Sequence, residues 1–135
     1  MDLYKSMQIS ASGMKAQGTR LRVISENIAN ADSTGETPGA QPYRRKVVTF
    51  GETMDRELKV PLVQVKNIST DQSEFTRKYD PGHPAADKDG YVLIPNVNPL
   101  IEVTDMREAQ RSYEANLKVL ETTRSMLENT LGILR

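Results

Sequence analysis

The sequence predicts an α+β fold, in which long N- and C-terminal helices pack as an antiparallel coiled coil with a small strand-rich central insertion. Two observations lead to this prediction. Both ends of the chain carry apolar residues at alternating spacings of three and four, which is the pattern of a coiled-coil helix. Between the ends, short β-branched and aromatic runs alternate with turn residues, as in strands.

These patterns divide the 135 residues into four segments. An N-terminal helix is expected over residues 1–31, a loop over 32–46, a strand-rich region over 47–99 and a C-terminal helix over 100–135. The two helical segments should pair in antiparallel fashion if the connecting chain loops back within one subunit.

The first helical pattern extends from residue 3 to residue 30, and large side chains alternate with small ones along its seam. The seam consists of Met7, Ala11, Met14, Gly18, Leu21, Ser25 and Ile28. Small residues allow a neighbouring backbone to come close and leave hollows for large side chains of a partner helix. Asn27 and Asn30 are expected to end the helix and to bond backbone groups or a neighbour.

The middle of the chain begins with a loop, because residues 32–42 are rich in Gly, Pro, Ser and Thr. The three basic residues Arg44, Arg45 and Lys46 follow, either as a solvated edge or in contact with an acidic neighbour. Because proline cannot donate a backbone hydrogen bond to a neighbouring strand, the strand that contains Pro61 is expected at a sheet edge or at a bulge. The predicted strands are Val47–Phe50, Leu58–Ile68, Phe75–Tyr79 and Tyr91–Ile94.

The C-terminal pattern has a seam of Val103, Met106, Gln110, Tyr113, Leu117, Leu120, Arg124, Leu127, Leu131 and Leu134. A second apolar row, Val119, Met126 and Ile133, lies beside it at heptad spacing, which indicates contact with more than one neighbouring helix. Gln110 and Arg124 either fix the register of the pairing or lie at an exposed edge. Thr104 or Asp105 is expected to cap this helix.

The composition argues against several classes of function. The 18 basic and 18 acidic residues cancel, which disfavours a general attraction to nucleic acid or anionic membranes. The sequence has no Cys and no apolar run near the ~20 residues that span a bilayer. The N-terminus lacks the basic and apolar regions of a Sec signal peptide. We therefore expect neither a thiolate metal site nor a membrane-spanning helix.

No motif predicts an enzyme, a cofactor, a metal site or a small-molecule substrate. The single histidine, His83, sits in a turn without further metal ligands nearby except Asp. Residues 87–90 suggest a calcium loop, but Ala85 and Asn96 would occupy the first and last ligand positions of an EF-hand. A hairpin turn explains these residues better.

Several short motifs instead occur in one order along the chain. They are Asn27-Ile28-Ala29-Asn30, Tyr43-Arg44, Asp80-Pro81 with Pro84, Gly90-Tyr91, Pro95-Asn96 and Tyr113-Glu114-Ala115-Asn116. Together they resemble the bacterial flagellar axial proteins, and among these the proximal rod subunits of the basal body. The resemblance covers about residue 7 to residue 134, although residues 52–78 carry no matching motif.

The resemblance implies a structural subunit that polymerises through its terminal helices into a hollow helical rod. Such a rod transmits torque from motor to hook and conducts exported subunits. The implied partners are copies of the same chain, other proximal and distal rod proteins, the hook-basal-body adaptor protein, membrane-ring components and the flagellar type III export apparatus. The implied location is the periplasmic rod, reached without a cleaved signal peptide. A soluble coiled-coil adaptor or chaperone that binds a partner helix is the alternative.

We expect the assembly interface to lie on the terminal helices. Its residues are Met7, Ala11, Met14, Gly18, Leu21, Ile28, Tyr113, Leu117, Val119, Leu120, Met126, Leu127, Leu131, Ile133 and Leu134. The large N-terminal seam residues should pack against those of the C-terminal seam, with the second apolar row facing an adjacent subunit. Because burial of the seam and the entropy of ordering nearly cancel, frayed termini are expected in the free subunit.

Overall fold

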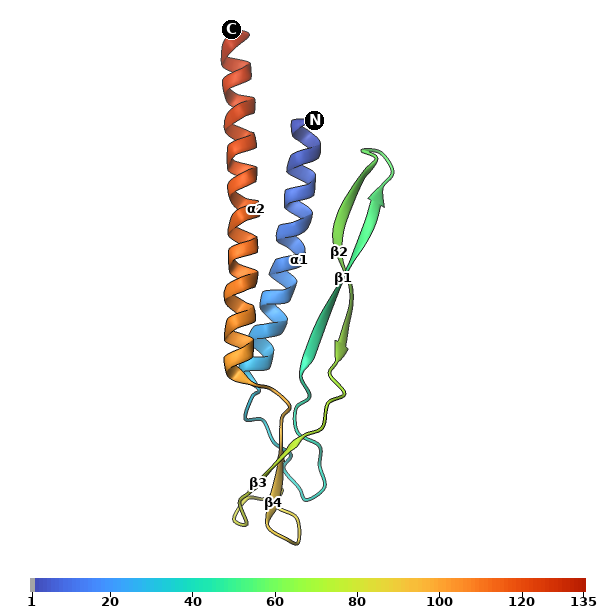
Figure 1. Cartoon of the computed structure of the whole chain (residues 1–135), viewed down its shortest axis with the longest axis vertical. Helices are drawn as coiled ribbons and strands as arrows, with labels where there is room; N and C mark the ends of the chain where they lie inside the picture. The colour runs from blue at the N-terminus through green and yellow to red at the C-terminus, as the bar shows by residue number, and fades with distance from the viewer. Residues whose placement is uncertain (1) are drawn as a thin grey trace. The chain divides into compact units, whose positions relative to one another are not determined.

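The computed structural model describes residues 2–135 and confirms the α+β fold with two long helices and a central strand region (Figure 1). Met1, part of the predicted N-terminal helix, lies outside the described residues. The elements are α1 Leu3–Ala29, β1 Lys46–Asp55, β2 Val60–Thr70, β3 Thr76–Tyr79, β4 Tyr91–Ile94 and α2 Pro99–Ile133.

The chain forms two compact units, to which both helices contribute. The first unit contains Met1–Leu21, Val48–Asn67 and Arg107–Arg135. The second contains Arg22–Val47 and Ile68–Met106. Each unit is described in turn below.

In the first unit, α1 and α2 lie side by side in antiparallel orientation (Figure 1). Arg20 forms an ion pair with Glu108 at 3.6 Å, and Gly13 lies against the side chain of Asn116. Further toward the chain ends, Leu3 and Met126 line one cavity. Residues earlier in α1 therefore lie against residues later in α2. The last turns of α2 extend beyond the start of α1 (Figure 1).

The buried side chains of the first unit are small rather than large. On α2 they are Ala109 and Thr123, and on α1 they are Ser10 and Ala16. Tyr113, Leu120 and Leu127 of the predicted seam are half-buried, whereas its Leu117 and Leu131 are exposed. At these positions of α2, the residue buried within the chain is thus the small one next to a predicted seam residue, and not the seam residue itself.

Within the single chain, the closely packed glycine of α1 is Gly13 rather than Gly18. Gly18 was expected to permit a close approach, but no atom lies within 4 Å of where its Cβ would be. At Gly13, an added Cβ would lie 2.9 Å from the amide nitrogen of Asn116. The close approach within this unit is therefore at Gly13, five residues earlier in the helix.

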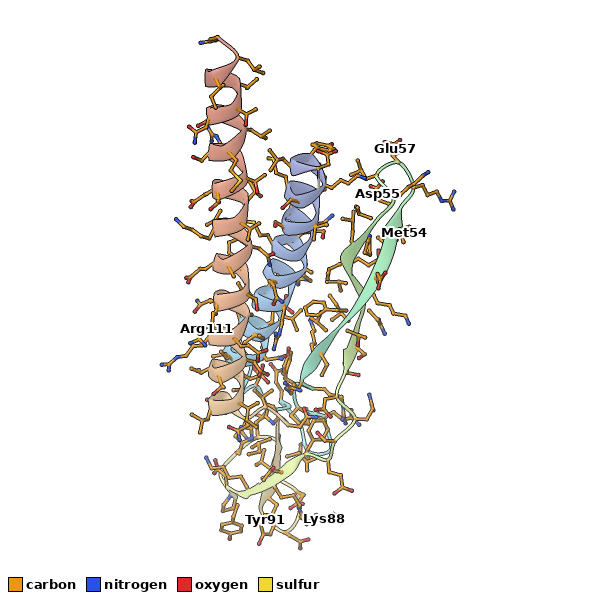
Figure 2. The ribbon with its side chains drawn as sticks, turned by 45° about the horizontal axis from the view of Figure 1, so that its top comes forward. Met54, Asp55, Glu57, Lys88, Tyr91 and Arg111 are labelled. Carbon is orange, nitrogen blue, oxygen red and sulfur yellow. The ribbon has the colours of Figure 1, made fainter. Side chains whose placement is uncertain are left out.

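Strands β1 and β2 form one two-stranded sheet beside α1 in the first unit, where the backbone N–H of Val63 donates to the hydroxyl of Ser12 at 3.3 Å. Figure 2 shows Asp55 and Glu57 at the turn that joins the strands. The Asp55 carboxylate accepts the backbone N–H groups of Glu57 and Leu58, both at 2.9 Å. Pro61 lies within β2, where it is tolerated because each strand of a two-stranded sheet is an edge strand.

In the second unit, strands β3 and β4 form a separate antiparallel sheet with Thr76 opposite Ile94 and Tyr79 opposite Tyr91. Val92 is buried while Tyr91 and Leu93 on either side of it are exposed, so the hairpin packs with one face. Gly90 has a φ of 82°, and a Cβ there would lie 2.9 Å from the Tyr79 ring, so glycine is required at this turn.

Helix α2 begins before both of its predicted caps. Its cap is Asn98, whose side-chain oxygen accepts the backbone N–H of Leu100 at 3.1 Å. Pro99 takes the first helical position, where its fixed φ suits the helix and a missing N–H costs nothing. The predicted caps were wrong, because Thr104 already lies inside the helix and its hydroxyl donates to the Leu100 carbonyl. Asp105 lies one residue further inside.

Candidate functional site

A cluster of polar side chains in the second unit joins the end of α1, the start of β1 and the start of α2. We call it the polar junction, and it consists of Asn27, Tyr43, Arg45, Lys46, Asn96 and Glu102. Asn27 is 1% exposed and Glu102 is 0% exposed, and they are among the largest fully buried side chains of the described residues. Buried polar groups destabilise a fold unless they are hydrogen-bonded, so the hydrogen bonds of this cluster decide whether it stabilises the fold.

The carboxamide of Asn27 uses all of its hydrogen-bonding capacity. Its oxygen accepts the backbone N–H of Lys46 at 2.9 Å and the hydroxyl of Tyr43 at 2.8 Å. Its nitrogen donates to the Lys46 carbonyl at 2.9 Å and to the Glu102 carboxylate at 3.1 Å. One side chain near the end of α1 therefore holds the first residue of β1 and the first turns of α2.

The buried Glu102 carboxylate is paired with a guanidinium group. The Nε of Arg45 donates to one carboxylate oxygen of Glu102, and the Asn27 amide donates to the other. Arg45 also lies 3.6 Å from carboxylate oxygens of Asp71 and Asp105. Burial alone would lower the pKa of Arg45, but the hydrogen bond and charge of Glu102 outweigh burial and raise that pKa. The charge of Glu102 is thus compensated within the cluster.

The side chain of Asn96 bonds the backbone of both Arg45 and Asp71. Its side-chain oxygen accepts the Arg45 N–H at 2.8 Å, and its nitrogen donates to the carbonyl of Asp71 at 3.0 Å. The Arg44 guanidinium donates to the same carbonyl at 2.9 Å and lies 4.2 Å from the centre of the Phe75 ring. Of the two alternatives for the basic run, contact with local partners is the one observed.

A partly exposed ion pair borders the junction. The Lys46 ammonium donates to the Glu26 carboxylate at 2.9 Å. This hydrogen bond is the main cause that lowers the pKa of Glu26, and it also raises the pKa of Lys46. Burial raises the pKa of the Tyr43 phenol, which favours the neutral form that donates to Asn27.

The junction brings together motif residues that are far apart in the sequence. Asn27, Tyr43 and Asn96 belong to it, while Asn30 ends α1 through a hydrogen bond from its amide nitrogen to the Glu26 carbonyl at 2.8 Å. Of the other residues in the first motif, Ile28 is half-buried and Ala29 is exposed.

The remaining motif residues lie elsewhere. The Asp80 N–H donates to the Gly90 carbonyl at 2.9 Å, closing the loop that carries Pro81 and Pro84. The rings of Tyr91 and Tyr79 pack edge to face, with their centres 5.3 Å apart. Pro95 is buried. Tyr113, Ala115 and Asn116 lie on α2 in the first unit.

Sequence reasoning missed three residues of structural importance: Gly13, Asn98 and Glu102. Glu102 had no visible signal, since an isolated glutamate near a helix start is usually exposed. The Asn98-Pro99 pair is a helix-start signal in its own right. A glycine at position 13 carries no cue that distinguishes it from Gly18.

The structure leaves much of the predicted assembly surface exposed. Met7, Met14, Gly18, Leu21, Ile28, Tyr113, Leu120 and Leu127 are half-buried, and Ala11 is exposed. Six apolar residues in the last part of the chain range from 38% exposed at Leu117 to 85% at Ile133. We call these six the α2 apolar surface, and they are Leu117, Val119, Met126, Leu131 and Ile133 of α2 together with Leu134, which follows it. Val119 and Met126 also line a cavity of about 530 Å³ with Leu3.

The described residues offer little for metal chemistry. No group of three or more His, Asp or Glu side chains within residues 2–135 could hold a metal ion. Both ring nitrogens of His83 have partners, the Ala85 N–H at 3.0 Å and the Thr34 hydroxyl at 3.1 Å. No helix in the described part of the chain is long and apolar enough to cross a membrane.

Comparisons with known proteins point to one family. A family model described as flagella basal body rod protein matches residues 7–35, and one described as flagellar basal body rod FlgEFG protein C-terminal matches residues 88–133. The two matches include most of α1 and α2.

Relatives match over nearly the whole chain. A flagellar basal-body rod protein FlgC of Agrobacterium fabrum is 54% identical over 133 residues, covering 98% of this chain and 96% of the relative. FlgC of Salmonella typhimurium is 41% identical over 134 residues, covering 98% of each chain. FlgC of Bacillus subtilis is 38% identical over 151 residues, covering 98% of this chain and 99% of the relative. The chain therefore belongs to the FlgC family of flagellar basal-body rod proteins.

Proposed function

We propose that this chain is a structural subunit of the proximal flagellar rod, where it polymerises through its terminal helices into a hollow shaft. The shaft transmits torque from motor to hook and conducts exported subunits. The role is structural and not catalytic. Membership of the FlgC family supports it, and no comparison favours the alternative of a soluble coiled-coil adaptor.

The observation that carries the proposal is the α2 apolar surface. Its six side chains are exposed in the single chain although each of them is large and apolar. Burial of such a side chain is worth about 1.5–3 kcal/mol, so a surface of this kind favours association with neighbouring helices. In the rod, we place Val119, Met126 and Ile133 against an adjacent subunit.

The polar junction gives the subunit a fixed anchor for torque. Its hydrogen bonds join the end of α1, the start of β1 and the start of α2. Buried and mutually satisfied polar groups specify one geometry more strictly than apolar contacts do. We propose that the junction holds the second unit in one geometry while the terminal helices contact their neighbours.

The proposed partners are copies of this chain, other proximal and distal rod proteins, the hook-basal-body adaptor protein, membrane-ring components and the type III export apparatus. The proposed location is the periplasmic rod of the basal body, reached without a cleaved signal peptide. Intact mass spectrometry of the chain from purified basal bodies would test the last point, since cleavage would shorten its N-terminus.

Purification of basal bodies from cells that express the chain tests the function directly. The proposal expects the chain among the rod proteins in quantitative mass spectrometry, at a fixed ratio to them. The adaptor alternative expects the chain in a soluble complex of fixed stoichiometry and its absence from washed basal bodies. That second result would overturn the proposal.

A further inference from the structure

We propose that Gly13 and Asn116 act as a register lock, in which the amide of Asn116 fills the space that a side chain at position 13 would occupy. The lock selects one antiparallel register of α1 and α2. It deepens the proposed function, and rests on it, because the register decides where the α2 apolar surface lies relative to α1. Both residues belong to the first unit.

The space at Gly13 is filled by a polar side chain rather than by backbone. An added Cβ would lie 2.9 Å from the Nδ2 of Asn116 and 3.2 Å from both its Cγ and its Oδ1. Contacts shorter than 3.0 Å require something to shift. The end of the Asn116 side chain would therefore have to shift to admit a methyl group at position 13, so the effect depends on how firmly that side chain is held.

The Asn116 side chain is not free to move without loss. Its Nδ2 donates to the carbonyl of Ser112, one turn earlier in α2, at 3.0 Å. Rotation of the side chain away from α1 would break this hydrogen bond. The amide is thus held over Gly13 by its own helix, in the manner of a knob seated in a hole.

The surroundings of the pair explain why one polar contact can decide the register. The neighbouring buried positions of this unit are small, namely Ser10, Ala109 and Thr123. Small side chains produce a shallow surface on which a helix could shift by a few residues at low cost. A single polar residue at a seam position is known to fix register in coiled coils, at some cost in stability.

Gly18 provides a matched comparison in the same helix. It is half-buried like Gly13, but open space surrounds the position of its Cβ. Glycine inside a helix is unfavourable relative to alanine, so Gly18→Ala should strengthen the helix. The same substitution at Gly13 meets Asn116. The two variants differ in one contact and share their effect on helix propensity.

The experiment replaces the chromosomal gene with four variants: Gly13→Ala, Gly18→Ala, Asn116→Ala and the double variant Gly13→Ala/Asn116→Ala. Swimming in soft agar and the amount of the chain in purified basal bodies are measured for each, with immunoblots to confirm expression. The proposal expects Gly13→Ala to lower swimming and incorporation, and Gly18→Ala to retain both. Asn116→Ala should also lower both, because it removes the amide that selects the register, and the double variant should be no worse than either single variant because all three lose the same contact.

Two results would overturn the register lock. One is an equal effect of Gly13→Ala and Gly18→Ala, whether both swim or both fail. The other is an Asn116→Ala variant that swims and is incorporated into basal bodies like wild type. Either result would leave the proposed function intact as long as the wild-type chain is found in basal bodies, whereas its absence there would overturn the proposed function itself.

Discussion

The side-chain amide of Asn27 bonds both backbone groups of Lys46: its oxygen accepts the N–H and its nitrogen donates to the carbonyl, each at 2.9 Å. A neighbouring β strand would offer the same pair of bonds. The first residue of β1 is thus satisfied by a helix side chain where the sheet itself begins. Since Asn27 also bonds Glu102 and Tyr43, one residue connects three elements.

Replacement of Asn27 by alanine should therefore destabilise the second unit strongly. The change leaves the Lys46 backbone groups and the Glu102 oxygen without partners, and each unsatisfied buried group costs about 1–3 kcal/mol. We expect a loss of roughly 3 kcal/mol or more in the free energy of unfolding, measured by urea denaturation. Asn129→Ala, at an exposed position of α2, should change it little. Equal losses from the two variants would contradict the role of Asn27.

Removal of the Glu102 carboxylate should have a larger effect than removal of an exposed one. Glu102→Ala leaves the partly buried Arg45 without its closest counter-charge, which we expect to cost about 3–5 kcal/mol. Glu108→Ala removes the exposed carboxylate that pairs with Arg20 at 3.6 Å, where the expected cost is below about 1 kcal/mol. Urea denaturation of both variants measures the contrast. Similar costs would show that the buried pair contributes no more than a surface pair.

The Glu26–Lys46 ion pair gives the stability a defined dependence on pH. The pKa of Glu26 is lowered from its usual 4.5, so its contribution is complete above pH 4.5 and is lost as the pH falls through the lower folded value. The pKa of Lys46 is raised from 10.5, so its contribution is lost as the pH rises above 10.5 through the higher folded value.

The variant Glu26→Gln checks this dependence through Tm measured as a function of pH. Wild type should have the higher Tm near neutral pH, and the two curves should converge in acid, where Glu26 is protonated and uncharged. A constant difference between the curves down to strong acid would exclude the ion pair as its origin.

The start of α2 can be tested by comparing the observed cap with a predicted one. Asn98→Ala removes the acceptor for the Leu100 N–H and should cost about 0.5–2 kcal/mol in the free energy of unfolding. Thr104→Ala removes only a hydroxyl bonded to a carbonyl within the helix, and alanine has the higher helix propensity, so this variant should be neutral or slightly stabilising. The reverse order would mean that the helix starts near Thr104.

The sequence was informative about elements because their periodicities are local. The 3,4 spacing predicts both long helices, and the β-branched runs predict strands at each place where one occurs. The heptad pattern does not show which apolar residues are buried within the chain. Leu117 and Leu131 satisfy the pattern as well as Leu120 and Leu127 do, yet they are exposed. The spacing of apolar residues indicates that one face of a helix will be buried. It does not show whether the covering helix belongs to the same chain or to another.

The polar junction could not be derived from the sequence for a different reason. Its contacts join residues 19 to 75 positions apart, such as Asn27 with Lys46 and Asn27 with Glu102. No local pattern encodes such pairs, and a buried glutamate runs against the usual preference of that residue for the surface. Only the basic run from Arg44 to Lys46 suggested acidic neighbours, without identifying them.

The central claim is that the α2 apolar surface makes contact with neighbouring subunits, and incorporation of charge variants into basal bodies tests it most directly. Met126→Asp places a charge on this surface, and Ser125→Asp places the same charge on the adjacent exposed polar position. Mass spectrometry should find Met126→Asp depleted from purified basal bodies and Ser125→Asp present as in wild type, with both chains equally abundant in the cell. Equal incorporation of the two variants would contradict the claim.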